Sequence, residues 1–167
     1  MKIRDAQKEE IPHIRQQRIE AYSEHTSKIP ADHWQGLKEV LSSEGDLQPG
    51  VELMVAESDG KVIGSVPLYP PNMDAYEGQV DILDYPEIRL LAVAPEARGK
   101  GAASALIQEC IERAKTKGYH AIGLHTADFM ENALKLYQRF GFERMPQHDF
   151  EPANDGIIVK AFRLPLT

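Results

Sequence analysis

The sequence predicts an α/β fold of the α+β kind, with a mixed, mostly antiparallel sheet, one parallel pair of strands and helices on both faces. Two segments carry this prediction. Residues 51–57 and 61–68 are apolar stretches that flank Asp59-Gly60, and this pattern predicts a β-hairpin. Residues 88–126 alternate as strand, helix and strand, and a right-handed connection makes the two strands of such a unit parallel.

The helices are predicted from apolar residues at helical spacing. Residues 98–117 show the clearest pattern, with Leu106, Ile107 and Cys110 on one side and Gly118 as a natural stop. The full prediction has strands at 2–6, 51–57, 61–68, 88–93, 120–126 and 157–163, and helices at 8–22, 31–41, 98–117 and 130–140.

The composition fits a single domain over residues 1–167. Hydrophobic residues make up 42% and charged residues 27% of the chain, an ordinary mixture for a globular protein. No apolar run approaches the roughly 18 residues of a membrane helix, and the N-terminal residues lack the apolar core of a signal peptide. Cys110 is the only cysteine, so no intrachain disulfide can form. Together these features predict a cytoplasmic protein that does not bind a membrane.

The net charge of −7 argues against general nucleic-acid binding, which requires a basic face. The charge has two interpretations: it keeps the protein soluble, or it attracts cationic substrates such as amines. The irregular segment 69–86 holds several acidic residues and no lysine or arginine. This segment is either a solvated loop or a wall that selects an amine, and the sequence leaves both interpretations open.

The segment from Arg98 to Ser104 has the composition of an anion-binding helix start. Gly99 and Gly101 are followed by small residues, so a bulky anion can approach the N–H groups of the first helical turn. Arg98 and Lys100 add positive charge and hydrogen-bond donors. A pyrophosphate fits this arrangement, but this segment alone is equally consistent with a helix start that binds no ligand.

Neither common nucleotide-binding motif is present. The Walker pattern requires Gly-Lys followed by Ser or Thr, whereas Gly99-Lys100 is followed by Gly101. The dinucleotide fingerprint requires Gly or Ala where Ser104 stands, and residues 94–97 separate the glycines from the preceding strand. A nucleotide-binding α/β protein is therefore a weaker alternative.

Residues 91–103, Leu-Ala-Val-Ala-Pro-Glu-Ala-Arg-Gly-Lys-Gly-Ala-Ala, resemble the acyl-CoA signature of the GNAT superfamily of N-acetyltransferases. Arg98, Gly101 and Ala103 fill the core positions of that signature. Residues 133–142 resemble the family's next helix and strand, and two motifs in order are more specific than one. The resemblance implies a GNAT-like sheet whose central parallel strands splay around acetyl-CoA, the cosubstrate.

The resemblance also implies a cofactor site. In this family the strand before the loop is bulged and pairs with pantetheine, and the loop surrounds the pyrophosphate. The implied cofactor-binding residues are Leu91, Ala92 and Val93 for pantetheine, and Arg98, Gly99, Lys100, Gly101, Ala102, Ala103 and Ser104 for the pyrophosphate.

One position departs from the family. Many members carry an asparagine seven residues before the tyrosine of the second motif, and Met130 stands there in this chain. Asn132 lies nearby but out of register, so the asparagine's cofactor contact is not carried over to it.

Acetyl transfer needs a group that deprotonates the amine, donors for the thioester oxygen and a proton for the departing thiolate. Tyr137 resembles the family's general acid, although its position also fits a core tyrosine. Glu87 is the candidate base, because several family members place a glutamate at the start of this strand; an exposed strand-end carboxylate is the alternative. Backbone N–H groups of residues 91–93 are the expected oxyanion donors.

Other polar residues carry weaker hypotheses. Tyr22, His25, His33 and Trp34 fall where this family builds its acceptor pocket, but packing is the commoner role for each of them. His125 fits a structural histidine better than an acceptor contact. The spacing of histidines and acids predicts no metal site.

The predicted function is transfer of the acetyl group from acetyl-CoA to a primary amine, directly and in a ternary complex. Cys110 fits a small core residue rather than a nucleophile, so no acetyl-cysteine is expected. The acceptor is a small-molecule or peptide amine whose identity the sequence leaves open. The alternative is a catalytically silent acyl-CoA-binding sensor or scaffold. A homodimer is compatible with the resemblance, but no residue fixes its surface.

Overall fold

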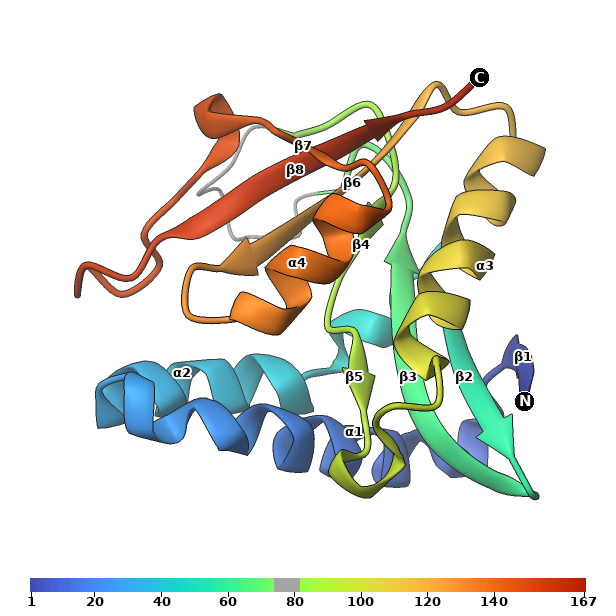
Figure 1. Cartoon of the computed structure of the whole chain (residues 1–167), viewed down its shortest axis with the longest axis horizontal. Coiled ribbons are helices and arrows are strands. Elements are labelled where there is room, and N and C mark those ends of the chain that lie inside the picture. The colour runs from blue at the N-terminus through green and yellow to red at the C-terminus, as the bar shows by residue number, and fades with distance from the viewer. Residues whose placement is uncertain (74–81) are drawn as a thin grey trace.

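Eight strands form one sheet in the computed structural model, which describes residues 1–73 and 82–167 (Figure 1). They are β1 (Lys2–Asp5), β2 (Glu52–Ser58), β3 (Lys61–Tyr69), β4 (Glu87–Ile88), β5 (Ala92–Val93), β6 (Ala121–Ala127), β7 (Glu143–Arg144) and β8 (Val159–Pro165). The order across the sheet is β1-β2-β3-β4-β6-β8-β7, and β5 pairs with β3 off this path. Residues 74–81, the middle of the acidic segment 69–86, lie outside the described residues. The choice between a solvated loop and an amine-selecting wall therefore falls outside what the structure describes.

The sheet is mixed, as predicted. β4 and β6 run parallel, with Glu87 opposite Gly123. The remaining pairs between described strands are antiparallel. β2 and β3 form the predicted hairpin, and φ is positive at both Asp59 (51°) and Gly60 (75°), as a tight hairpin turn requires.

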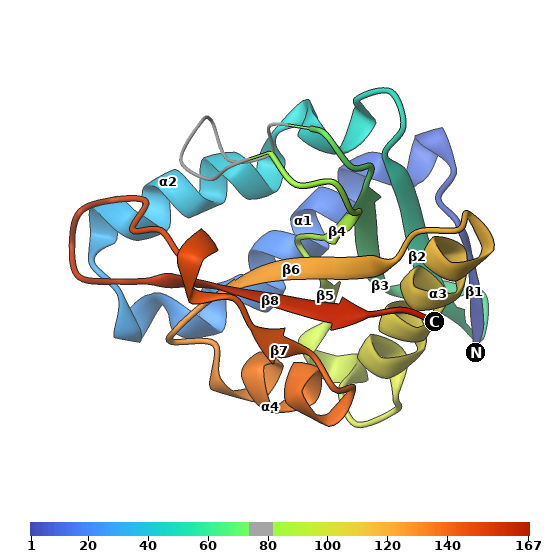
Figure 2. The same ribbon diagram turned by 90° about the horizontal axis from the view of Figure 1, so that it is seen from above.

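Helices pack on both faces of the sheet. In the described part of the chain they are α1 (Ile11–Tyr22), α2 (Ala31–Ser42), α3 (Ala102–Thr116) and α4 (Glu131–Arg139). Figure 2 shows α1 and α2 on one side of the sheet and α3 and α4 on the other, so the predicted layering is confirmed. The helix predicted from Lys8 opens with a 3-10 turn, and α1 starts at Ile11 because Pro12 fits only the first turn of a helix.

The start of α3 corrects one prediction. The sequence pattern predicted a helix from Arg98, whereas α3 begins at Ala102. Gly99 and Gly101 have φ values of 83° and 82°, in the left-handed region that interrupts a right-handed helix. Residues 98–101 therefore form a loop that leads into the helix.

The strand predicted at 88–93 also needs correction, because the structure divides it into β4 and β5. Between the pairs Ile88–Leu68 and Ala92–Ser65, this segment has three residues where β3 has two, which defines a β-bulge. Leu90 sits in the bulge with φ at 51°, an uncommon conformation for a branched residue. The bulge that the resemblance implied is therefore present, and it separates β5 from β6.

Two apolar clusters hold this arrangement. In the larger one, α3 packs on the sheet through Leu106, Ile107 and Cys110, which are fully buried. The smaller one joins α1 and α2 to Ala92 of β5. Gly64 of β3 lets β5 approach, because a Cβ at this glycine would lie 2.9 Å from the Ala92 carbonyl oxygen. These contacts fix β5 between α1 and α3.

Candidate active site

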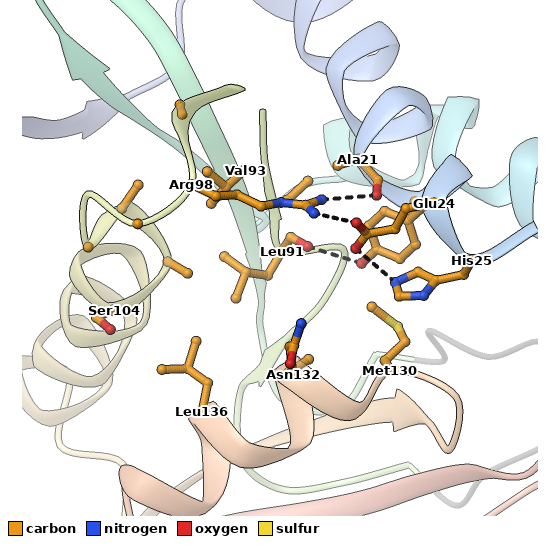
Figure 3. A pocket seen from close by; sticks show the side chains of 18 of the residues that line it. Ala21, Glu24, His25, Leu91, Val93, Arg98, Ser104, Met130, Asn132 and Leu136 are labelled. Atoms are coloured by element: carbon orange, nitrogen blue, oxygen red, sulfur yellow. Dashed lines mark hydrogen bonds and ion pairs between the residues drawn. The ribbon is translucent and has the colours of Figure 1, made fainter. Parts of the chain in front are cut away.

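A cavity of about 310 Å³ lies where four segments meet. Its walls come from the end of α1 with the turn that follows, from β5, from the loop and first turn of α3, and from α4. Figure 3 shows Ser104, Leu91 and Asn132 on separate walls of this space. The cavity therefore depends on the tertiary fold and joins parts of the chain that are far apart in sequence.

Nearly all residues that the signature predicted for the cofactor border this cavity. Lys100 is the exception, because its neighbours in the loop line the cavity and it does not. Their role in binding stays a prediction, but the structure brings them to one place. The predicted residues on the wall are Leu91, Ala92, Val93, Arg98, Gly99, Gly101, Ala102, Ala103 and Ser104.

β5 turns one backbone edge toward β3 and the other away from it. The Ala94 N–H donates to the Ile63 carbonyl at 2.8 Å, and hydrogen-bonded and free positions alternate along an antiparallel strand. The backbone groups of Leu91 and Val93 therefore point away from β3. Among the described residues, no strand pairs with this outer edge of β5.

Tyr22 already uses one group of the outer edge. Its hydroxyl, at the end of α1, donates to the Leu91 carbonyl oxygen at 3.1 Å. The side chain is buried, and burial raises the pKa of Tyr22 to about 12, so the hydroxyl keeps its proton. Because Tyr22 bonds only the Leu91 carbonyl, the Leu91 N–H and the N–H and carbonyl of Val93 remain available to a ligand in the cavity.

The first turn of α3 supplies further donors. Ala105 is the first residue whose N–H enters the helical ladder, since it donates to the Gly101 carbonyl at 3.0 Å. The N–H groups of Ala102, Ala103 and Ser104 precede it, and Gly101 has no side chain that could cap them. These donors carry the partial positive charge of the helix start and face the same cavity as β5.

Arg98 reaches from the loop before α3 toward the end of α1 (Figure 3). Its guanidinium donates to the Glu24 carboxylate and, at 3.3 Å, to the Ala21 carbonyl oxygen. The loop before α3 is thereby tied to the end of α1. Arg139 of α4 also lines the cavity, which adds a second cation to its walls.

A family comparison fits this geometry. Residues 11–142 match the model of the acetyltransferase (GNAT) family. The chain belongs to this family. The matched range includes both motifs that carried the resemblance, so the predicted membership is confirmed.

Curated relatives of this GNAT protein are N-acetyltransferases. N-acetyltransferase 8B of Homo sapiens is 36% identical over 100 residues, which are 58% of this chain and 40% of that protein. The uncharacterized N-acetyltransferase YjgM of Escherichia coli K12 is 32% identical over 98 residues, which are 59% of this chain and 54% of that protein. The chain thus covers about half or less of the length of these relatives.

Solved structures share the fold over nearly the whole chain. An N-acetyltransferase from Staphylococcus aureus Mu50 has a TM-score of 0.70 at 24% identity, covering 99% of this chain and 98% of that one. The yncA protein of Salmonella typhimurium, solved with its cofactor acetyl-CoA, has a TM-score of 0.66 at 20% identity, covering 99% and 94%. These likenesses establish the GNAT fold.

Tyr137, the GNAT residue predicted as the acid, lies on α4 behind the cavity wall. It is 6% exposed, packs edge-on against Phe142 and does not line the cavity itself. Burial raises the pKa of its hydroxyl well above the usual value, and Tyr22 and Cys110 are near enough to add to this rise. Within the described residues the hydroxyl has no hydrogen-bond partner. It is therefore a protonated donor with its proton uncommitted.

Glu87, the predicted base, is held by a histidine. Its carboxylate lies 2.8 Å from Nδ1 of His125, and Nε2 of His125 lies 3.0 Å from the His148 carbonyl oxygen. A carbonyl oxygen can only accept, so Nε2 carries a proton and a further proton is shared between Nδ1 and Glu87. Both side chains are buried, and neither lines the cavity. The bonding of both His125 nitrogens is what a structural histidine would show, and the roles of His125 and Glu87 stay predictions.

Sequence analysis missed three polar residues of the cavity wall. Glu24 and Arg139 were not singled out, and Asn132 was set aside as out of register, yet it lines the cavity beside Met130. The sequence held no signal for Glu24, because its partner Arg98 is 74 residues away. For Asn132 the sequence showed only a position two residues from Met130, and residues two apart point to different sides of a helix, so the pattern did not place it on the wall.

Neither a group of metal-ligating side chains nor a membrane-spanning helix is found in the part of the chain that the structure describes. No group of three or more His, Cys, Asp and Glu side chains there could hold a metal ion. No helix there is long and apolar enough to cross a membrane.

Proposed function

We propose that this GNAT protein transfers the acetyl group of acetyl-CoA to a primary amine, directly and in a ternary complex. One observation carries the proposal. The free outer edge of β5 and the uncapped start of α3 face the same cavity. A ligand with amides at one end and a pyrophosphate at the other matches both walls, and CoA has this structure.

The cofactor would lie along the cavity in one direction. The N–H groups of Ala102, Ala103 and Ser104 would bind the pyrophosphate, with Arg98 and Arg139 adding charge. Val93 offers an N–H and a carbonyl to the amides of pantetheine, as a neighbouring strand would. The thioester would then reach the bulge near Leu91, where the cavity meets Tyr22 and Met130.

The bulge is suited to the chemical step. The thioester oxygen becomes negative as the amine attacks, and the Leu91 N–H is a fixed donor at the end of the free edge. The departing thiolate needs a proton, and Tyr137 is a buried hydroxyl whose proton no described residue holds. We assign the acid role to Tyr137 on these grounds.

The amine must lose a proton, because a free alkylamine has a pKa of about 10.4 and is charged at neutral pH. Glu87 is the base that the sequence analysis put forward. It stands at the start of β4, next to the bulge, and its proton is shared with His125. To act as the base, Glu87 together with His125 must take one further proton.

A screen of amines for CoASH release tests the proposal. Polyamines, aminoglycosides, amino acids and short peptides would be offered with acetyl-CoA, and the acetylated product confirmed by mass. We expect release that depends on one class of amine, with acetyl-CoA raising the melting temperature. A rise in melting temperature without release in any class would instead favour the sensor. ATP binding tighter than CoA binding would reject both.

A further inference from the structure

His25 is a titratable residue on the cavity wall that the mechanism above does not use. It belongs to the 3-10 turn Ser23–Lys28 that follows α1. Its side chain is 13% exposed, and Figure 3 shows it on the same side of the view as Met130, which also lines the cavity. It therefore lies at the end of the cavity where the acetyl group would stand.

The two ring nitrogens of His25 have different surroundings. Nδ1 is buried and has no hydrogen-bond partner, and the ring packs against Phe129 with 5.3 Å between ring centroids. Nε2 lies 3.3 Å from Oε1 of Glu24. Nε2 is therefore the nitrogen that a ligand can reach, and a carboxylate stands beside it.

Glu24 is fixed from its other side. Its Oε2 accepts a hydrogen bond from Arg98, the arginine of the cofactor loop. Arg98, Glu24 and His25 thus form a chain from the loop that faces the pyrophosphate to the opposite end of the cavity (Figure 3). A proton that arrives on Nε2 would form an ion pair with Glu24.

Burial favours the neutral form of His25. Burial lowers the pKa of His25 below its ordinary value of 6.5, Lys28 and Arg98 lower it further, and Glu24 opposes them. His33 of α2 reaches the same Phe129 ring edge-on, and it is bound to Asp155. At neutral pH the imidazole is therefore neutral, and in the tautomer that carries its proton on Nδ1 the lone pair of Nε2 is free to accept a proton.

We propose that Nε2 of His25 takes the proton of the acceptor amine. This assignment rests on the proposed function and adds a catalytic residue to it. The charged amine first loses one proton to solvent, and the neutral nitrogen then bonds to the thioester carbon while a second proton passes to Nε2. The carbon–sulfur bond then breaks, and the sulfur takes the Tyr137 proton. Tyr137 regains a proton from solvent and His25 releases one, so the products are the amide and CoASH and the protein is unchanged.

Three glutamine variants test this assignment against Glu87. His25→Gln removes the base, Glu87→Gln removes the alternative, and His33→Gln is a matched control that also alters packing on Phe129 but lies off the cavity wall. The amine found in the screen is used at saturating acetyl-CoA, and rates are measured from pH 5 to 9. The melting temperature and the acetyl-CoA KM are recorded for each variant.

We expect His25→Gln to lower kcat about a hundredfold or more with little change in the acetyl-CoA KM. The wild type should show an inflection in its acid limb below pH 6.5, and His25→Gln should lack it. His33→Gln should keep both the rate and the inflection. In His25→Ala, added imidazole should restore part of the rate, which a packing role would not allow.

Several results would overturn the assignment. These are normal kcat with a retained inflection in His25→Gln, an equal loss in His33→Gln, no imidazole rescue, or loss of the inflection in Glu87→Gln alone. Failure of the proposed function would look different: the wild type would bind acetyl-CoA without acetylating any amine, and the assignment would fall with it.

Discussion

The proposed cofactor wall and the candidate proton-transfer groups of this protein are built in different ways. The wall runs through one continuous segment, residues 91–104, and works through backbone N–H and carbonyl groups. The candidates for proton transfer come from separate elements: His25 follows α1, Glu87 is in β4 and Tyr137 is in α4. Their properties depend on burial: it raises the pKa of Tyr137, lowers the pKa of His25 and encloses the pair of Glu87 with His125.

The difference shows what each kind of site demands. A backbone site needs only a local conformation, and the glycines and small residues that allow it stand next to one another. A proton-transfer site needs a free lone pair or a free proton in the right place. His125 and His25 illustrate this, because both contact a glutamate, yet His125 has both ring nitrogens occupied and His25 leaves one reachable.

The largest effect should come from Tyr137→Phe. Removing the hydroxyl deletes the proposed acid and no hydrogen bond among the described residues, so kcat should fall about a hundredfold or more. The melting temperature and the acetyl-CoA KM should change little. Steady-state kinetics and calorimetry measure these quantities. An unchanged kcat across pH at saturating substrates would remove Tyr137 from the mechanism.

A pair of glycine variants separates backbone strain from ligand contact on the cofactor wall. Gly101 and Gly118 stand at opposite ends of α3, with φ values of 82° and 81°, and a Cβ has open space at both. A valine at either should cost about 1–2 kcal/mol of stability, because L residues resist this conformation. Only Gly101→Val should also block the anion, and weaken acetyl-CoA binding about tenfold or more.

Isothermal titration calorimetry and chemical denaturation measure the two quantities. Equal acetyl-CoA affinity in Gly101→Val and Gly118→Val would show that the start of α3 does not contact the cofactor. That result would contradict the proposal that the segment 91–104 binds the cofactor through its backbone.

A smaller effect is expected from Tyr22→Phe. Tyr22 contacts the proposed cofactor wall at Leu91 and lies beside the candidate proton-transfer groups. The variant keeps the ring in the core and frees the Leu91 carbonyl, so the bulge loses one anchor. Loss of a hydrogen bond of about 0.5–1.5 kcal/mol should raise the acetyl-CoA KM roughly two- to tenfold. The value of kcat should stay within about threefold of the wild type. A fall in kcat alone would mean that Tyr22 acts in the chemical step.

Much of the fold could be predicted from the sequence because its signals are local. Asp59-Gly60 predicted the hairpin, and the apolar spacing of Leu106, Ile107 and Cys110 predicted the buried face of α3. The two errors, an unbroken strand at 88–93 and a helix from Arg98, also arose from reading local patterns. Apolar residues run through 88–93 regardless of a bulge, and a helix pattern does not show that Gly99 and Gly101 adopt positive φ.

The candidate site could be predicted only where it is contiguous. The cofactor wall was placed by its signature, whereas the partners of its charged side chains were not. Arg98 pairs with a residue 74 positions away, Glu87 with one 38 positions away and His33 with one 122 positions away. A single sequence carries no record of such pairs, because the fold alone brings them together.

The outer edge of β5 has a wider consequence. Proteins usually conceal a free strand edge, since a strand from another chain can add to it and start aggregation. Here the edge spans only a few residues and opens into a cavity rather than onto the surface. The N–H and carbonyl groups of Val93 can pair there with the amides of a ligand instead of with a strand. An edge that would invite pairing with another chain at an exposed position is here enclosed by α1, α3 and α4.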